Sequence, residues 1–252
     1  MAIEGIKYQK ILPDKSISQF VECFWMLENN SGMKKEVTVM PDANFDMVIS
    51  KDETEPFSIF LLGLSSSFDA RELEGRTRMF FISFKLLAAE YLFQKPIANL
   101  LNGVEQLPTH TWGLEEKDLS NFKTFTEKCT TIVASLICPE IDLRKEKLFN
   151  FIYSSNGEMS VKELSDRASW SSRQINRYFN QYFGLSLKEY CSILRFRTSF
   201  RHITDGKLYP EGNFADQAHF SREVKRLSGV NPRELHKNKN DRFIQVSAIS
   251  KK

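Results

Sequence analysis

The pattern of hydrophobic and polar positions divides the chain into two parts. Over residues 1 to about 112, short apolar runs rich in β-branched and aromatic residues alternate with polar breaks such as NNSG, KDETEP and SSSF. The clearest runs are KKEVTVMP, FDMVISK, FSIFLLGL and TRMFFISFKLL. Runs of this length between turn residues are typical of β-strands. The pattern therefore predicts a β-rich N-terminal part, with one short helix beginning near Ser16 in SISQFVEC.

Beyond this part the apolar spacing becomes that of a helix. Apolar side chains recur at steps of three and four, which places them on one face of a long amphipathic helix. The positions are Leu119, Phe122, Thr126, Cys129, Ile132, Val133 and Leu136. This face can pack on its own domain or pair with a second copy of the chain in a homodimer, and the pattern leaves both open.

A boundary follows at Pro139 and the charged run EIDLRKEK. We therefore expect two domains, residues 1–140 and 141–252, of which the second is almost wholly helical to about residue 237. Its first helix spans LRKEKLFNFIYSS and ends at Asn156 and Gly157. The C-terminal run NKNDRFIQVSAISKK either frays or folds back on the body. The expected fold class is α+β.

The helical part contains the same pattern twice. RYFNQYFGLSLKEY, residues 177–190, matches REVKRLSGVNPREL, residues 222–235, with an offset of 45 positions. On a helical wheel the first copy has an apolar arc opposite a hydrogen-bonding arc, and the second copy repeats both. The apolar positions are Ile175, Tyr178, Phe179 and Tyr182, then Phe220, Val224 and Leu227. The opposite positions are Arg173, Asn176, Arg177 and Asn180, then Ala218, Ser221, Arg222 and Lys225.

Helix start signals agree with this division. The pairs Ser160 and Glu163, Ser171 and Gln174, and Ser186 and Glu189 match the S-x-x-E/Q capping box, and Asn231 precedes Pro232 as an N-cap would. VKELSDRA then forms a two-turn helix, SWS a tight connection and SRQINRYFNQYF a second helix. This is the spacing of a helix-turn-helix unit, whose second helix enters the major groove of DNA. Arginine and asparagine side chains match the donors and acceptors of base edges there.

Charge supports a nucleic-acid partner. Residues 146–252 contain 19 Lys and Arg against 11 Asp and Glu, whereas residues 1–145 contain 16 against 21. Local positive charge is what phosphate neutralisation requires.

The run S-x-R-x-I-x-R-x-F with Gly184, Tyr190 and Arg195, together with FADQAHFSREVKR and GVNPREL, resembles the DNA-binding domain of AraC/XylS-type transcription regulators over residues 159–237. The resemblance implies two helix-turn-helix units joined by a linking helix, KEYCSILRFRTSFRHI, that holds two recognition helices in successive major grooves about 34 Å apart. It also implies double-stranded DNA and RNA polymerase as partners, and a small-molecule effector of unknown identity. PDANFDMVIS and MFFISFK resemble, more faintly, N-terminal sensing or dimerisation domains of such regulators. The family's base-contacting positions fall on Arg173, Asn176, Arg177, Gln217, Ala218, Ser221 and Arg222.

One segment departs from the family pattern. GKLYPEGN stands where the second unit should have its scaffold helix, and its glycines and Pro210 disfavour a helix. Asn213 also replaces the glycine that usually precedes the aromatic residue at Phe214. Either the second recognition helix is held another way, by the linking helix and Tyr209, or it no longer docks properly on DNA. In both cases we expect weaker base readout there.

Other function classes find less support. The only histidine among the first 145 residues is His110, so the β-rich part cannot build a histidine metal centre. Asp42 and Asp46 in PDANFD fit a turn with a capping carboxylate, and Ser65 to Ser67 have no evident base. We expect no enzyme activity, no cofactor, no membrane segment and a cytoplasmic location with buried free thiols. The alternative function is a protein-interaction adaptor whose helix-turn-helix domain has lost specific DNA binding.

Overall fold

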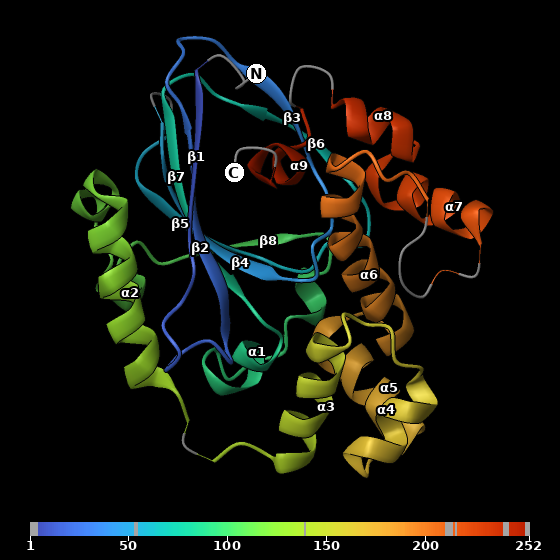
Figure 1. Ribbon diagram of the computed structural model, residues 1–252. Helices are drawn as coiled ribbons and strands as arrows, with labels where there is room; N and C mark the ends of the chain where they lie inside the picture. Colours follow the sequence, from blue (N-terminus) through green and yellow to red (C-terminus); the bar gives the residue numbers. More distant parts are fainter. Residues whose placement is uncertain are drawn as a thin grey trace.

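The computed structural model describes residues 5–52, 55–138, 140–209, 214, 216–238 and 242–249. A β-rich N-terminal part is followed by an all-α part, so the expected α+β fold class is confirmed. The strands stand on one side of the molecule and helices α3 to α8 cover the other side (Figure 1).

The N-terminal part consists of two antiparallel sheets. The larger sheet has the order β1-β2-β7-β4-β5-β8, and the smaller pairs β3 with β6. The bounds in the larger sheet are β1 Ile6–Ile11, β2 Val21–Asn29, β7 Thr77–Phe84, β4 Phe45–Lys51, β5 Ser58–Leu62 and β8 Val104–Leu107. The smaller sheet contains β3 Lys35–Val39 and β6 Asp69–Leu73. The four runs singled out in the sequence became β3, β4, β5 and β7.

Strand β2 corrects one prediction. The helix expected near Ser16 is wrong, because Val21 to Cys23 belong to a strand that pairs with β1 and β7. Before it, the chain makes a turn in which the amides of Phe20 and Val21 donate to the carbonyl of Ile17. A central strand buried on both faces carries a continuous apolar run, which periodicity cannot distinguish from a buried helix. The strands β1, β6 and β8 were not predicted either.

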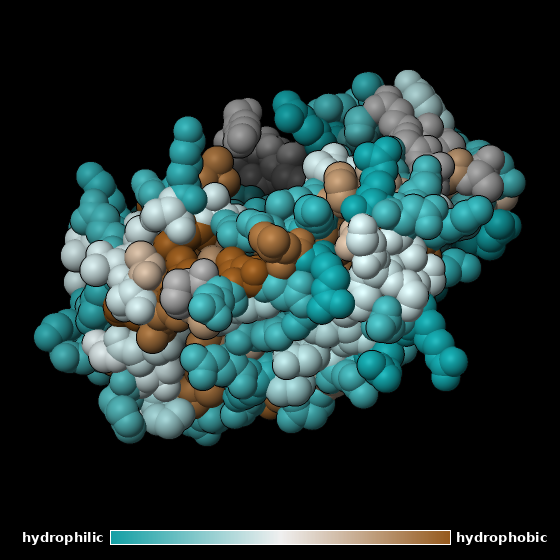
Figure 2. All heavy atoms as spheres, turned by 90° about the horizontal axis from the view of Figure 1, so that it is seen from below, coloured by the Kyte–Doolittle hydropathy of each residue, from teal (hydrophilic) through white to brown (hydrophobic). Residues whose placement is uncertain are grey.

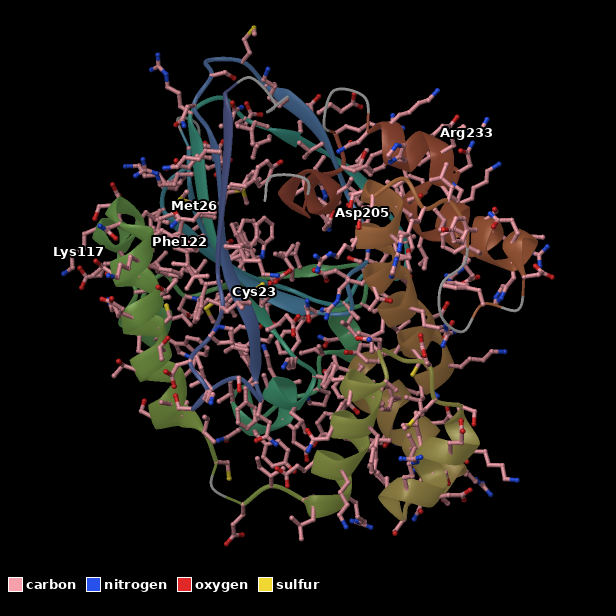
Figure 3. All side chains as sticks on the ribbon, in the orientation of Figure 1. Cys23, Met26, Lys117, Phe122, Asp205 and Arg233 are labelled. Atoms are coloured by element: carbon pink, nitrogen blue, oxygen red, sulfur yellow. The ribbon has the colours of Figure 1, made fainter. Side chains whose placement is uncertain are left out.

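Helix α2, Phe122–Leu136, packs on the larger sheet. The rings of Phe122 and Phe125 each lie 5.1 Å from the ring of Phe80 in β7. Figure 3 shows Met26 of β2 and Phe122 side by side between the sheet and the helix. The predicted amphipathic face is therefore used within its own domain, and a homodimer stays a prediction. The helix predicted to include Leu119 starts only at Phe122. Leu119 lies instead in the separate 3-10 turn η3, Glu116–Ser120.

The helices that follow α2 have the predicted order as far as α8, whereas three short helical elements around the sheet were not predicted. These three are α1 Leu87–Tyr91, η1 Ala98–Leu100 and η2 Thr111–Gly113. The helical part contains α3 Leu143–Ser154, α4 Val161–Ala168, α5 Ser172–Phe183, α6 Leu187–Thr204, α7 Gln217–Ser228, α8 Pro232–Lys237 and α9 Ile244–Ile249. Asn156 and Gly157, both with positive φ, end α3 where the sequence indicated. Pro139, the expected boundary marker, lies outside the described residues.

The two parts share one continuous hydrophobic core. Tyr190 of α6 donates a 3.0 Å hydrogen bond to the carbonyl of Ala43, and the Leu86 amide donates to the hydroxyl of Tyr153 in α3. Arg197 of α6 forms a 3.0 Å ion pair with Glu22 of β2. Because apolar side chains from both parts pack together, the division into two domains at residues 140 and 141 stays a prediction.

The C-terminal segment folds back between the two parts. The side chains of Phe243, Ile244 and Val246 are buried. The amide of Thr38 in β3 donates to the carbonyl of Arg242 at 2.6 Å, and the side chain of Gln245 exchanges hydrogen bonds with the main chain of Met40. Over residues 242–249 the segment therefore packs on the body rather than fraying. Among the helices of the described residues, none combines the length and apolar character needed to cross a bilayer.

Candidate nucleic-acid interface

Helices α4 and α5 are joined by a tight, well-bonded turn. Ser169 ends α4 in the left-handed conformation, with φ 51° and ψ 43°. The amide of Trp170 then donates to the carbonyl of Ser165, whose hydroxyl donates back to the carbonyl of Trp170 at 2.8 Å. Ser171 caps α5 in a capping box with Gln174. Both helices thus have the predicted bounds, and local hydrogen bonds set the angle at which α5 leaves the turn.

Aromatic packing holds this unit to its neighbours. The ring of Trp170 lies 5.3 Å from that of Tyr178 in α5, and the guanidinium of Arg144 in α3 lies 5.6 Å from the Trp170 ring. Tyr178 also donates a 2.9 Å hydrogen bond to Glu90, which pairs with Lys145. Burial together with the carboxylate of Glu90 raises the pKa of Tyr178 far above its ordinary value, so this hydroxyl remains a donor.

The polar face of α5 lies at the surface as predicted. Arg173, Arg177 and Asn180 are exposed, whereas Asn176 is half-buried and its amide donates to the carbonyl of Ser172 at 3.0 Å. The opposite face is buried through Ile175, Tyr178, Phe179 and Phe183. Tyr182, expected in the core, is half-buried. Phe183 is buried instead, because the hydrophobic core extends around the C-terminal end of α5.

Neither Arg173 nor Arg177 forms an ion pair with a carboxylate among the described residues. Cations at the boundary with the β-rich part, in contrast, are paired. The paired examples are Lys145 with Glu90 and Arg197 with Glu22. Unpaired guanidinium groups on a helix face can offer their donors to base edges or phosphates.

The surface around this unit is polar. Figure 2 gives the view from below, in which the half that holds α4 and α5 is mostly hydrophilic, while hydrophobic atoms gather over the half that holds the strands. Among the exposed large hydrophobic residues, Leu12 lies in the β1–β2 connection, Leu136 ends α2 and Leu143 begins α3, so none of these three belongs to α4 or α5. Phe68 and Tyr209 are exposed too, and Phe68 lies against Gly229 at the end of α7.

Helix α7 repeats the arrangement with fewer free donors. Phe220, Val224 and Leu227 are buried. Opposite them, Ala218, Arg222 and Lys225 are exposed and Ser221 is half-buried. The amide of Gln217 is already used, because it donates to the carbonyl of Leu208 at 2.8 Å and to the hydroxyl of Ser221 at 3.3 Å. Neither Arg222 nor Lys225 has an ion-pair partner among the described residues.

The second unit lacks a scaffold helix over the described residues. Residues 205–209 are turn and irregular chain, and Pro210 to Asn213 lie outside the described part. The linking helix holds α7, as expected, through Ser192, whose hydroxyl donates to Glu223. The ring of Phe214 packs 5.1 Å from that of Phe220. The expected role of Tyr209 is wrong, because this side chain is 57% exposed.

The linking helix sets the scale of the whole interface. Helix α6 has 18 residues and so is about 27 Å long. Figure 1 shows α5 beside one end of α6, and α7 and α8 beside its other half. The length of α6 is thus comparable with one turn of DNA, about 34 Å. Gln181, exposed one turn after Arg177, extends the polar face of α5 and was missed because it lies at the margin of the wheel arc.

Other candidate chemistry in the chain is structural. The amide of Asn44 donates to the carboxylate of Asp42 at 3.1 Å, as expected of a capped turn. The hydroxyl of Ser83 donates to Asp46 and accepts a 3.0 Å hydrogen bond from the indole of Trp25, a contact that sequence spacing could not reveal. Burial and the neighbouring Asp42 raise the pKa of Asp46 to about 8. The described residues contain no cluster of three metal-ligating side chains, and all four cysteines are free thiols, with Cys138 half-buried and the others buried.

A pocket of about 300 Å³ lies between the larger sheet and the start of α2. Its lining includes the apolar side chains of Met26, Phe80 and Phe122 and the cations Lys7 and Lys123. Glu28 also lines it and pairs with Lys7 at 3.6 Å. The volume is at the lower end of the range for small-molecule sites.

Comparisons with known proteins cover the β-rich part best. Residues 9–106 match the family described as "Domain of unknown function (DUF6597)". This match runs from within β1 to within β8 and covers less than half of the chain. No curated protein matches the chain.

Several solved structures of ToxT from Vibrio cholerae are similar over most of their length. One shares 14% identity with a TM-score of 0.43, covering 92% of this chain and 97% of that chain. A second, bound to (E)-4-(8-methylnaphthalen-1-yl)but-3-enoic acid, shares 15% identity with a TM-score of 0.43 and the same coverage. A third, bound to an unsaturated fatty acid, shares 12% identity with a TM-score of 0.41, covering 91% and 93%. Scores at this level do not place the chain in a family, so its function must be argued from its own residues.

Proposed function

We propose that this chain is a sequence-specific, double-stranded-DNA-binding transcription regulator in which α5 and α7 are the recognition helices. The observation that carries the proposal is the exposed, unpaired guanidinium pair Arg173 and Arg177 on a capped helix behind a tight turn. Two arginines at i and i+4 lie one above the other on a helix and reach the same groove.

The polar residues of α5 would have different roles in DNA binding according to their positions on the helix. Arg173 and Arg177 would read base edges with their paired donors, each good bidentate contact contributing about 1–3 kcal/mol of discrimination. Asn180, one turn from Asn176, would contact the groove wall or backbone. Asn176 would use its carbonyl and its second amide hydrogen, since one donor is already bonded within the helix.

The second recognition helix would contribute less. Arg222 and Lys225 would bind phosphate or a base, and Ala218 can offer only its methyl group to a thymine methyl. The amide hydrogens of Gln217 are bonded to Leu208 and Ser221, so base contact would use its carbonyl oxygen, and Ser221 would use its hydroxyl hydrogen, which these bonds do not involve. Phosphate contacts from this helix position the protein without carrying sequence information.

The rest of the chain would serve regulation. We assign residues 1–140 to an effector or dimerisation domain and residues 141–252 to the DNA-binding domain. The resemblance to AraC/XylS-type regulators implies two further partners, RNA polymerase and a small-molecule effector of unknown identity. The pocket between the larger sheet and α2 is the place where we would first look for an effector, because its lining combines apolar side chains with the charged groups of Lys7, Glu28 and Lys123.

The test is selection of bound fragments from a random duplex library, followed by titration of the winning duplex. We expect a defined motif, and a loss of about tenfold or more in specific affinity for Arg173→Ala and for Arg177→Ala. Lys15→Ala, which removes an exposed cation in the β1–β2 connection, is the matched control and should leave affinity unchanged.

Salt separates this proposal from its alternative. Specific DNA binding through phosphates falls steeply as salt rises. A chain that selects no motif and shows no salt-dependent binding to duplex DNA would instead support the protein-interaction adaptor, whose helix-turn-helix domain no longer reads DNA.

A further inference from the structure

The two recognition helices end in equivalent glycines. Gly184 and Gly229 are 45 positions apart, each is the left-handed C-cap of its helix, and their φ angles are 75° and 78°. A left-handed C-cap alone explains a glycine at either place. It does not explain why the β-rich part contacts both glycines.

Each glycine is a contact point for the β-rich part. A Cβ built on Gly184 would lie 2.9 Å from the carbonyl oxygen of Ala98 in η1. A Cβ built on Gly229 would lie 2.7 Å from the ring of Phe68, in the connection between β5 and β6. Neither glycine has room for a side chain, so the backbone of each recognition helix is held directly against the other part of the protein.

The two contacting segments are bonded to each other. The amide of Asn102 donates to the carbonyl of Leu64 at 2.8 Å, and its side-chain oxygen accepts from the amide of Ser66 at 2.8 Å. The amide of Gly63 donates to the carbonyl of Gly103 at 3.1 Å. We call residues 63–68 together with residues 97–103 the platform.

The platform also bonds to the first recognition helix. The amide of Ile97 donates to the carbonyl of Tyr182 at 2.8 Å, which satisfies one of the last carbonyls of α5. On the second helix, Phe68 contacts Gly229 although its ring remains 43% exposed. The platform thus touches the C-terminal ends of both helices, while Arg173, Arg177 and Arg222 remain exposed for DNA contacts.

We propose that the platform sets the separation and relative orientation of α5 and α7, and so determines which spacing between two DNA subsites the protein accepts. This rests on the proposed function. In the first unit, α4 already braces α5. In the second unit no helix occupies the corresponding place among the described residues, and Phe68 supplies the missing support from the β-rich part. Phe68 and Asn102 are therefore positioning residues for specificity.

The experiment measures spacing tolerance. Once selection has yielded a duplex with two subsites, one or two base pairs are inserted or removed between them. Each base pair shifts the second subsite by about 3.4 Å along the axis and rotates it around the duplex. The wild-type chain should lose about tenfold in affinity per base pair, whereas Phe68→Ala and Asn102→Ala should lose less than about threefold. Base preference within the first subsite should stay unchanged.

One control variant and one measurement without DNA distinguish a specific role of Phe68 from the loss of any exposed side chain. Leu12→Ala removes another exposed large side chain, at a position 72% exposed in the β1–β2 connection, and should keep the wild-type spacing profile. Hydrogen exchange supplies a readout without DNA. In Phe68→Ala the α7 amides should exchange faster, while the α5 amides keep their protection.

The outcomes distinguish two failures. If the wild-type chain selects no motif, the proposed function and the platform proposal fall together. If the wild-type chain is sharply selective for spacing and Phe68→Ala and Asn102→Ala keep that selectivity, the platform proposal alone is wrong, and α6 by itself sets the spacing.

Discussion

The ring of Phe68 lies directly over Gly229, so that a Cβ on the glycine would be 2.7 Å from the Cζ atom of the phenylalanine. The two residues come from opposite parts of the chain, one before β6 and one after α7. Their contact links the β-rich part to the end of the second candidate recognition helix, and it can be tested without any DNA.

Gly229→Ala should destabilise the protein for two separable reasons. A left-handed φ of 78° costs a residue with a Cβ about 1–2 kcal/mol, and the added methyl group also meets the Phe68 ring. In a Phe68→Ala background only the backbone cost remains. Denaturant unfolding of the wild type, both single variants and the double variant should therefore give a smaller loss for Gly229→Ala when Phe68 is absent. Equal losses in the two backgrounds would mean that the ring moves aside freely.

Arg177→Ala should cost more specific affinity than Arg222→Ala. Helix α5 is braced by α4 and by the Trp170 packing, whereas α7 has no scaffold helix among the described residues. Losing a bidentate base contact from a fixed helix costs about 1–3 kcal/mol, equal to roughly 5-fold to 150-fold. Titration of the selected duplex at one fixed salt concentration measures both variants, and a non-specific duplex serves as the reference. Equal or reversed losses would contradict the ranking.

Stability should fall as pH rises from about 4 to about 8 through Asp46. Its pKa is raised to about 8 by burial and by Asp42, whereas the unfolded chain ionises near 3.8. Between these values the folded state holds one more proton, so its full contribution is present below about pH 4 and lost as pH rises through about 8. The slope is at most about 1.4 kcal/mol per pH unit.

Asp46→Asn isolates this effect, because asparagine resembles the protonated carboxyl and does not titrate. Urea unfolding of both proteins at several pH values should give curves that converge near pH 4 and separate towards pH 8, with the variant the more stable at the alkaline end. Parallel curves across the range would show that Asp46 is ionised in the folded protein.

Phe243→Ala should destabilise the protein by about 3–5 kcal/mol, the usual cost of truncating a buried phenylalanine. Phe243 is 2% exposed and lies in the C-terminal segment that bonds to β3 and Met40. The comparison variant is Arg242→Ala, which keeps the main-chain bond to Thr38 and removes only the exposed guanidinium that lies 4.7 Å from the Phe243 ring, a loss of about 1 kcal/mol or less. Thermal unfolding compares the two, and hydrogen exchange should show faster exchange in β3 for Phe243→Ala alone. A stability equal to that of the control would mean that the tail contributes little.

Local interactions explain what could be predicted in the helical part. Ser160, Ser171 and Ser186 cap their helices with the partners three positions later that the sequence indicated. Asn231 is the N-cap of α8 as indicated, and its partner Glu234 was not predicted. Such bonds join residues within one turn of helix, so they depend little on the rest of the fold. The exposed positions of Arg173 and Arg177 followed from helical periodicity in the same way.

Two misses have a common physical origin. Strand β2 was taken in part for a helix, because a strand covered on both faces loses the alternation that marks a strand. The place of Tyr209 was also predicted wrongly, since support for α7 comes from Ser192 and Phe214 and, at its far end, from Phe68. In both cases contacts between distant segments outweighed the local pattern.

The amino-acid sequence alone determined the order of strands before helices, the ends of the capped helices and the polar faces of α5 and α7, because periodicity, turn residues and caps act over a few neighbouring positions. Only the tertiary structure decided that the tail packs against β3, that Asp46 lies beside Ser83, and that Phe68 and Ala98 rest on Gly229 and Gly184. These contacts join residues up to two hundred positions apart, and they form because one shared core brings the two parts of the chain together.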